Sequence, residues 1–208
     1  MRLDARDLCI DRSARRIVSG LSFSVEAGQM LAVTGPNGAG KSTLLRALAG
    51  LLPLASGAIT CTGLPADEPL ASYTHYLGHR DALKSPLTAQ ENLAFWAAML
   101  VLPGAGGLPP EAALARLGLP HIAGFPVSYL SAGQKRRVAL ARLLVAHRPL
   151  WLLDEPTTAL DAASQGLVAG MIRDHLAGGG MVIAATHSAL GVEAQELRLS
   201  GPRTSSAL

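Results

Sequence analysis

Nine consecutive residues, from Gly35 to Thr43, have types and spacing suited to holding a phosphate group. They match the pattern G-x-x-x-x-G-K-[ST] without a mismatch. Glycines let the backbone curl around an anion, so that successive N–H groups point inward. Because Pro36 has no N–H, the donors must come from the residues after it. The predicted nucleotide-binding residues are Gly35, Pro36, Asn37, Gly38, Ala39, Gly40, Lys41, Ser42 and Thr43.

Lys41 and Ser42 supply the charge and the hydroxyl that this pattern uses. We expect the Lys41 ammonium to reach the β- and γ-phosphates, and the Ser42 hydroxyl to contact Mg²⁺. The apolar run Met30–Thr34 suits a buried strand, and a helix opening at Lys41 and ending near Ala49 would direct its first N–H groups at the phosphates. The alternative interpretation is a glycine-rich turn that binds nothing.

Two carboxylates, Asp154 and Glu155, follow the apolar run Leu150–Leu153. A doubly wound sheet presents its active site at the ends of such strands. Asp154 would belong to the shell of the Mg²⁺ ion, and Glu155 would orient and deprotonate the attacking water. Two neighbouring acids could instead form a solvated turn, but their combination with the phosphate loop favours a catalytic site.

A third stretch, Leu130–Gln134, opens a helix predicted to run to His147. Ser131 and Gln134 fit a capping box, which needs no ligand. The same helix N-terminus could also form a second anion site. One nucleotide does not need two phosphate cradles in one protomer, so a head-to-tail dimer would explain both. The run Lys135–Arg137 is interpreted as a solvated helix face in preference to the alternative, a partner site.

The remaining pattern predicts the elements that position these groups. Residues 3–10 and 21–25 alternate like a half-buried antiparallel pair joined by a basic tip at 12–16, and should form a small sheet beside the phosphate loop. Thr88 and Glu91 form a predicted capping box. The other predicted elements are strands 58–62, 73–77, 150–153 and 181–186 and helices 88–102 and 111–117, with a loop at 103–110.

We expect one α/β domain over residues 1–208, with a catalytic core of residues 1–84 and 147–200, an inserted helical subdomain at about 85–146, and a loose tail at 201–208. Cys9 and Cys61 have no partner spacing, which favours a reducing, cytoplasmic compartment. The run Leu93–Leu102 is too short to span a bilayer, so we expect no membrane crossing and no export. A net charge of +3 with 16% charged residues is too mild to favour nucleic acid. The mean hydropathy of +0.30 leaves room for an apolar docking surface.

Five motifs in order give the chain a resemblance to ATP-binding cassette ATPases, which covers nearly its whole length. They are the phosphate loop, Leu130–Gln134, Asp154–Glu155, Thr158–Asp161 and Thr186–His187. The resemblance implies a P-loop NTPase fold with a small antiparallel β subdomain and an inserted helical subdomain, and ATP hydrolysis coupled to transport, with ATP and Mg²⁺ as cofactors. By the same resemblance, His187 contacts the γ-phosphate and Asp161 couples two protomers. It also assigns the signature residues Ser131, Gly133 and Gln134 to ATP binding.

Within these ATPases, the chain resembles the subunit of the cytochrome c biogenesis, or heme exporter, transporter. The resemblance rests on residues 77–79, 87–93 and 130–143 and on the short length. It implies a CcmB-like integral membrane permease, other cytochrome c maturation proteins, a homodimer of ATPase subunits, and a peripheral position on the cytoplasmic face of the bacterial inner membrane, without nucleic acid. The alternatives are the ATPase of another exporter, or a soluble cassette protein acting on nucleic acid or the ribosome.

Two positions depart from the general cassette pattern. His79 stands nine residues before Thr88, where most cassettes have a glutamine that senses the γ-phosphate. This chain resembles the cytochrome c biogenesis group in having a histidine there. A neutral imidazole can accept a hydrogen bond at one nitrogen and donate one at the other. The aromatic residue that often stacks on adenine has no counterpart; the guanidinium of Arg12 can stack there, but more weakly.

Overall fold

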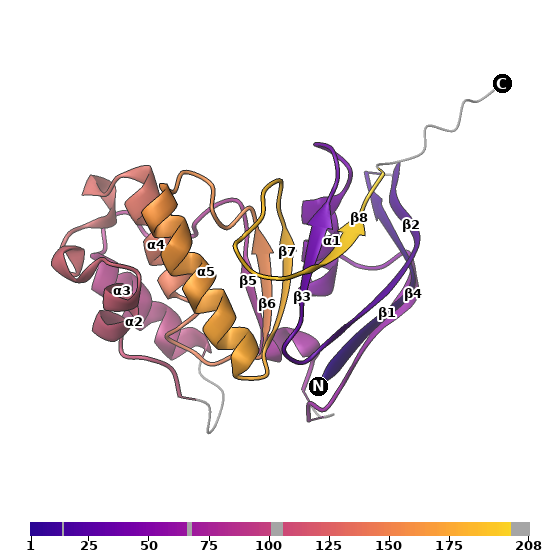
Figure 1. Cartoon of the computed structure of the whole chain (residues 1–208), viewed down its shortest axis with the longest axis horizontal. Helices are drawn as coiled ribbons and strands as arrows, with labels where there is room; N and C mark the ends of the chain where they lie inside the picture. The colour runs from indigo at the N-terminus through magenta and orange to yellow at the C-terminus, as the bar shows by residue number, and fades with distance from the viewer. Residues whose placement is uncertain (14, 66–67, 101–105, 201–208) are drawn as a thin grey trace.

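The computed structural model describes residues 1–13, 15–65, 68–100 and 106–200. Its two sheets stand side by side, with one α-helix between them and the other α-helices on the outer face of the parallel sheet (Figure 1). The strands are β1 (Arg2–Arg12), β2 (Arg15–Glu26), β3 (Met30–Thr34), β4 (Ser56–Thr62), β5 (Thr74–Leu77), β6 (Leu150–Asp154), β7 (Met181–Ala185) and β8 (Gln195–Arg198). The α-helices are α1 (Lys41–Leu48), α2 (Ala89–Leu100), α3 (Pro110–Arg116), α4 (Ala132–Ala141) and α5 (Ala162–Ala177), with short 3₁₀ turns η1 (Leu70–Tyr73), η2 (Pro120–Ile122) and η3 (Val127–Tyr129).

The predicted antiparallel pair is confirmed as part of a three-stranded sheet in the order β2-β1-β4. Both strands extend further than the alternating pattern indicated, since Arg12 pairs with Arg15 at the hairpin end. The basic tip therefore belongs mostly to the two strands. Its residue 14 lies outside the described residues, as do residues 101–102 of the predicted 88–102 helix, residues 103–105 of the predicted 103–110 loop and the predicted tail 201–208.

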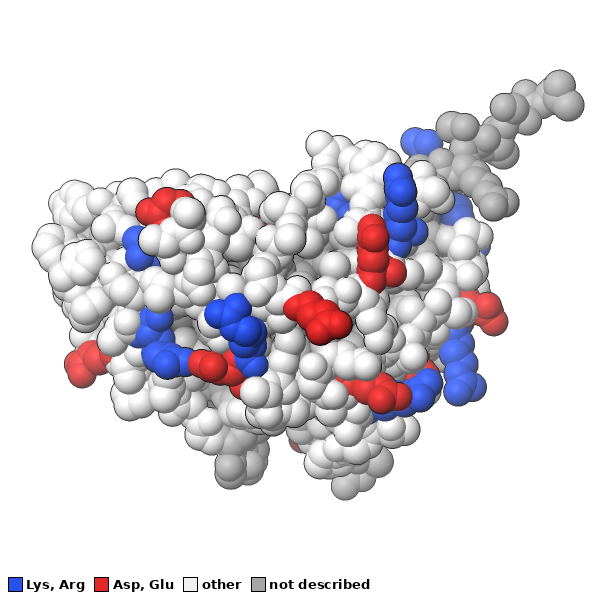
Figure 2. Space-filling view, viewed as in Figure 1, with Lys and Arg blue, Asp and Glu red and all other residues white. Residues whose placement is uncertain are grey.

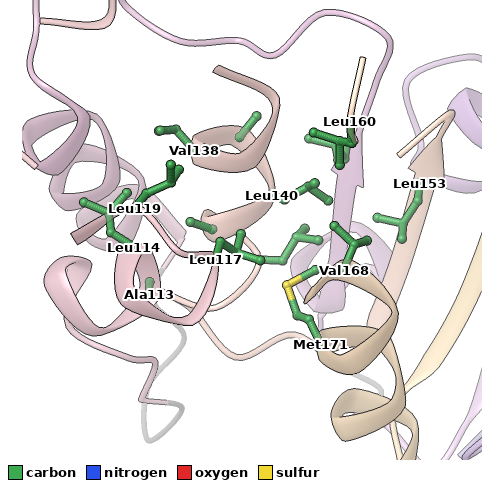
Figure 3. Packing of buried hydrophobic residues seen from close by; sticks show 14 of the residues in the cluster. Ala113, Leu114, Leu117, Leu119, Val138, Leu140, Leu153, Leu160, Val168 and Met171 are labelled. Carbon is green, nitrogen blue, oxygen red and sulfur yellow. The ribbon is translucent and has the colours of Figure 1, made fainter. Parts of the chain in front are cut away.

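The parallel sheet has the order β5-β6-β7-β3-β8. Alternate residues of its inner strands face opposite sides because side chains alternate along a strand. Leu153 and Val182 join an apolar cluster with α3, α4 and α5, whereas Leu152 and Ile183 join a second cluster with α1 and the antiparallel sheet. Figure 3 shows part of the first cluster, formed by side chains of α3, α4, α5 and β6. Both faces are covered, which explains why the sequence lacks alternation here.

The predicted α/β class with a small antiparallel sheet is thus confirmed. α4 is shorter than predicted: it ends at Ala141, and the chain continues to Ala146 in tighter turns. Two elements were not predicted, the edge strand β8 and the helix α5. Among the described residues no helix has the length and apolar character needed to cross a membrane.

Candidate functional site

A cleft of about 500 Å³ opens at the carboxyl edge of the parallel sheet, where the phosphate loop meets the ends of β6 and β7. Because β3, β6 and β7 run in parallel, the segments that follow them emerge at the same edge. The cleft is lined by Arg12, Ile17, Asn37, Gly38, Gly40, Lys41, Ser42, Thr43, His79, Asp154, Glu155, Thr158 and His187.

Two glycines of the phosphate loop are required by space as well as by conformation. Gly35 has a φ of 136°, and a Cβ there would lie 2.3 Å from the carbonyl oxygen of Leu199. Gly40 has a φ of 102°, and a Cβ there would lie 2.7 Å from Cγ2 of Ile17. Any side chain at either position would push the loop away from its neighbours, so the pattern's two fixed glycines have a steric reason here.

Lys41 is held inside the loop that it serves. Its side chain is buried, and its ammonium donates to the carbonyls of Gly35 at 2.7 Å and Pro36 at 3.2 Å. Nε2 of His187 lies 3.2 Å from the same ammonium. Because a lysine ammonium only donates, Nε2 of a neutral His187 would be the acceptor and Nδ1 would carry the proton. Lys41 thus presents a fixed positive charge at the floor of the cleft.

Ser42 and Asp154 form the oxygen pair expected of a magnesium site. The Ser42 hydroxyl donates to Oδ1 of Asp154 at 3.0 Å, and Asp154 is buried at 3% exposure. One hydroxyl and one carboxylate suit Mg²⁺, which keeps several other oxygen ligands from water or phosphate. The described residues contain no cluster of three or more His, Cys, Asp or Glu side chains that could hold a metal alone. The donor set therefore fits an ion that arrives with a nucleotide.

Glu155 has the backbone and side-chain environment of a reactive group. Its φ is +49°, a left-handed conformation that is uncommon outside glycine. Oε1 is inaccessible to solvent and accepts no hydrogen bond from the described part of the chain. Nε2 of His187 is 3.4 Å away, a charge contact only if that imidazole is protonated. The Glu155 carboxylate therefore keeps unused acceptor capacity beside the phosphate loop.

His79 and Arg12 both line the cleft, as the sequence indicated for the two departures from the cassette pattern. His79 enters from the segment after β5, and Arg12 from the end of β1. Ile17 of β2 adds an apolar surface beside Arg12. A guanidinium plane and a branched aliphatic side chain can together flank a flat ring, although more weakly than a tyrosine would.

The signature residues lie outside this cleft. The predicted capping box is confirmed: the Ser131 hydroxyl accepts from the Gln134 amide at 3.2 Å, and Oε1 of Gln134 accepts from the Ser131 amide at 2.9 Å. Gly133 packs so closely that a Cβ would lie 3.0 Å from the carbonyl oxygen of Ala159. Asp161 caps α5 by accepting from the Ser164 amide at 2.7 Å, and this bond lowers the pKa of its carboxyl group. The structure therefore does not bring these residues to the phosphate loop of their own chain.

The interpretation of Lys135–Arg137 as a solvated face is wrong for Arg136. Arg136 is 4% exposed, and its guanidinium donates to the backbone carbonyls of Asp154 and Glu155 at the carboxyl end of β6. Arg137 is partly buried as well and donates to the carbonyl of Leu117 at 3.1 Å. The charge run alone could not reveal this, because Arg136 has a cation on either side of it in the sequence.

The chain is similar to known ATP-binding proteins over nearly its whole length. A family model described as ABC transporter matches residues 18–158. The cytochrome c biogenesis ATP-binding export protein CcmA of Nitrobacter winogradskyi is 52% identical over 201 residues, covering 97% of this chain and 99% of that protein. The protein of the same name from Bradyrhizobium diazoefficiens is 51% identical, with the same coverage. A solved structure of a putative ABC transporter ATP-binding protein from Pyrococcus furiosus has a TM-score of 0.82 at 25% identity, covering 96% of this chain and 98% of its own.

Proposed function

The chain belongs to the ABC transporter family as an ATP-binding ATPase, and from that membership we propose that it energises a step of c-type cytochrome biogenesis by heme export or handling. The support is an identity of 51–52% over nearly the full length to proteins named cytochrome c biogenesis ATP-binding export protein CcmA. Such similarity along both chains makes a shared task more plausible than a shared fold alone would.

The observation that carries the proposed chemistry is the convergence of Lys41, Ser42, Asp154, Glu155 and His187 on one cleft. Lys41 and the phosphate-loop N–H groups bind the β- and γ-phosphates of ATP. Glu155 accepts the proton of the attacking water, and His187 orients the γ-phosphate. Mg²⁺, held by Ser42 and Asp154, would neutralise charge on the phosphates.

We propose that the complete site forms between two copies of the chain. Ser131, Gly133 and Gln134 sit at a helix N-terminus outside the cleft, so in a head-to-tail homodimer they would bind the ATP held by the partner's phosphate loop. Asp161, at the N-terminus of α5, would couple the two protomers. In this proposal residues 1–84 and 147–200 form the catalytic core, and residues 85–146 form a helical subdomain that carries Ser131.

We also propose that the subunit is a peripheral protein on the cytoplasmic face of the inner membrane, where it docks on a CcmB-like permease with other cytochrome c maturation proteins. The helix α2 leaves Met99 64% exposed and Phe95 38% exposed, which gives the outer surface an apolar area. On the face in Figure 2, Lys and Arg side chains are spread out among Asp and Glu. That distribution suits docking on protein better than tracking a phosphate backbone.

The proposed function is tested by complementation. A bacterial strain lacking its own export ATPase is supplied with this chain, and membrane-bound c-type cytochromes are measured by heme staining. We expect the wild-type chain to restore them and Glu155→Gln to fail at equal expression. Wild-type chain that hydrolyses ATP, assembles with the permease and still restores nothing would contradict the proposed role in cytochrome c biogenesis.

A further inference from the structure

Arg136 lies in α4, and its buried guanidinium contacts the carboxyl end of β6. Nη2 donates to the backbone carbonyls of Asp154 and Glu155, each at 2.7 Å. Nε donates to the carbonyl of Pro156 at 3.2 Å. The planar fork of an arginine can serve several acceptors at fixed angles, which a lysine ammonium cannot do. Three successive carbonyls, at the last residue of β6 and the two residues after it, are thus held by one side chain.

The other side of the same guanidinium holds the segment around His79. Nη1 donates to the carbonyl of Gly78 at 3.0 Å and to Oδ1 of Asp81 at 2.9 Å. The Arg136 side chain is 5% exposed, and Asp81 is the carboxylate that the described structure pairs with it. Burial strengthens charge-assisted hydrogen bonds of this kind. Arg136 therefore ties the His79 segment to the segment that carries Glu155.

This clamp acts on a backbone that is itself unusual. Glu155 has a φ of +49°, its amide donates to the carbonyl of Ala185 at 2.9 Å, and its carbonyl accepts from Arg136. Because the residue is held from both sides, the direction of its side chain is fixed with it. A conformation of this kind persists only where surrounding contacts determine it.

We propose that Arg136 is a positioning residue for ATP hydrolysis, which aims the Glu155 carboxylate and links it to the His79 segment and to the helix that begins at Ser131. The inference rests on the proposed role of Glu155 as the base. Arg136 is in the second turn of α4, whose first turn carries the signature residues. A displacement of that helix at a partner's nucleotide would be transmitted to the Glu155 segment through three hydrogen bonds of Arg136. Two more hydrogen bonds would transmit it to the His79 segment.

The test is Arg136→Lys in the purified full chain, alone and combined with Glu155→Gln. Lysine keeps the charge but loses the fork, so the carboxylate is misplaced while the phosphate loop is untouched. We expect kcat to fall by about 10- to 10²-fold, the usual cost of a misplacement near 1 Å. The Kd for ATP should stay within about threefold, because ground-state binding does not use Glu155.

The double variant separates positioning from general damage. If Arg136 acts through Glu155, Arg136→Lys should lower the residual kcat of Glu155→Gln by less than about twofold, because the group that it positions is already gone. A full multiplicative loss in the double variant, or an unchanged kcat in the single one, would overturn the inference. Full activity of Glu155→Gln alone would instead overturn the proposed base, so the two failures are distinguishable.

Two further variants guard against loss of folding. Arg142→Lys is the matched control, because Arg142 is equally buried and donates to the carbonyl of Tyr76, away from Glu155. It should lower Tm without lowering kcat per folded molecule. Should Arg136→Lys fail to fold, Asp81→Asn tests the same clamp from its more exposed end. We expect it to lower kcat by about three- to tenfold, and only while Glu155 is present; an equal loss without Glu155 would contradict the inference.

Discussion

The ammonium of Lys41 lies 3.2 Å from Nε2 of His187, although 146 positions separate the two residues in the chain. Lys41 opens α1 after β3, and His187 follows β7, which pairs in parallel with β3. The two side chains meet because both strands end at the same edge of the sheet. A γ-phosphate bound by Lys41 would therefore lie within reach of His187.

Replacing Lys41 by alanine should abolish ATP turnover while keeping the fold. Its ammonium binds two loop carbonyls and serves the phosphates, but it fills no apolar core. Circular dichroism and an ATPase assay measure the outcome, with Lys84→Ala as an exposed control that should keep full activity. A fully active Lys41→Ala protein would contradict the assignment of the phosphate loop as the ATP site.

Glu155→Gln should slow hydrolysis by on the order of 10² to 10⁴-fold, because a general base contributes about that much. ATP binding should survive, since the phosphate loop is unchanged, and ATP-bound dimers should accumulate on size-exclusion chromatography. Glu193→Gln, an exposed control, should hydrolyse normally. Unchanged turnover in Glu155→Gln would mean that another group, His187 first, activates the water.

Stability should fall in acid because of two histidines, one buried and one partly buried, that do not line the cleft. His75 is 2% exposed, and its Nε2 lies 2.7 Å from the carbonyl oxygen of Ala146, so the neutral ring donates from Nε2. Burial lowers the pKa of His75 from 6.5 to about 3, with Arg142 and Arg148 as weaker causes. Burial likewise lowers the pKa of His175 from 6.5 to about 4.

Because both folded pKa values lie below the unfolded value, the unfolded chain takes up protons first as the pH drops. The stabilisation is complete above about pH 6.5 and is lost as the pH falls toward about 4 for His175 and about 3 for His75, by up to about 1.4 kcal/mol per pH unit for each histidine. Urea unfolding at pH 7, 6 and 5 measures the slope. This slope is set by the number of protons taken up on unfolding. His75→Gln should reduce that number by about one, and adding His175→Gln should reduce it by about one more. A slope that neither substitution changes would contradict the lowered pKa values of these two histidines.

The phosphate loop and the strand-end carboxylates could be predicted because their geometry follows from local rules. Gly35–Thr43 has a fixed backbone requirement, and Asp154 follows a short apolar run without alternation, the pattern of a strand covered on both faces. The rule that parallel strands end at one edge then brings them together. Asp154 and Ser42 meet at 3.0 Å for that reason, with no long-range information needed.

Arg136 could not be predicted in the same way. A charged residue on a helix faces either solvent or backbone carbonyls, depending on how the helix is rotated against its neighbours. A run of three cations has no periodicity from which that rotation could be derived. The end of α4 at Ala141 is a similar case, because no glycine or proline stops the helix there. The edge strand β8 was not predicted because most of its residues are exposed and its sequence resembles that of a loop.

The contact with a membrane partner can be tested by crosslinking. Lys84 is exposed, and its ammonium lies 5.1 Å from the centre of the Phe95 ring on α2. After Cys9→Ser and Cys61→Ser remove the native thiols, Lys84→Cys carrying a bifunctional crosslinker should capture an integral membrane protein in the complex. A cysteine at Glu193, an exposed position elsewhere, is the control. Capture of only soluble proteins or nucleic acid at Lys84 would favour the non-transport alternative.

The composite site is tested by mixing two inactive proteins. Lys41→Ala disables the phosphate-loop half of a site, and Ser131→Arg fills the signature half with a bulky cation, so each homodimer has two broken sites. In a mixed dimer, a shared site places both lesions together and leaves the other site with an intact Lys41 and an intact Ser131. If each site lay within one chain, the mixed dimer would contain no intact site.

We therefore expect mixing with the membrane partner to restore part of the ATPase activity, in proportion to the fraction of mixed dimers. Differently tagged chains, purified in tandem, measure that fraction and supply the pure mixed dimer. The control is a mixed dimer of Lys41→Ala with Lys41→Ala,Ser131→Arg, which has no intact phosphate loop under either arrangement and should stay inactive. Recovery in the first dimer alone is hard to explain without a shared site, because neither chain has both halves. An inactive first dimer, alongside an active dimer of wild type with the doubly substituted chain, would count against it: that second dimer keeps both intact halves within the wild-type chain.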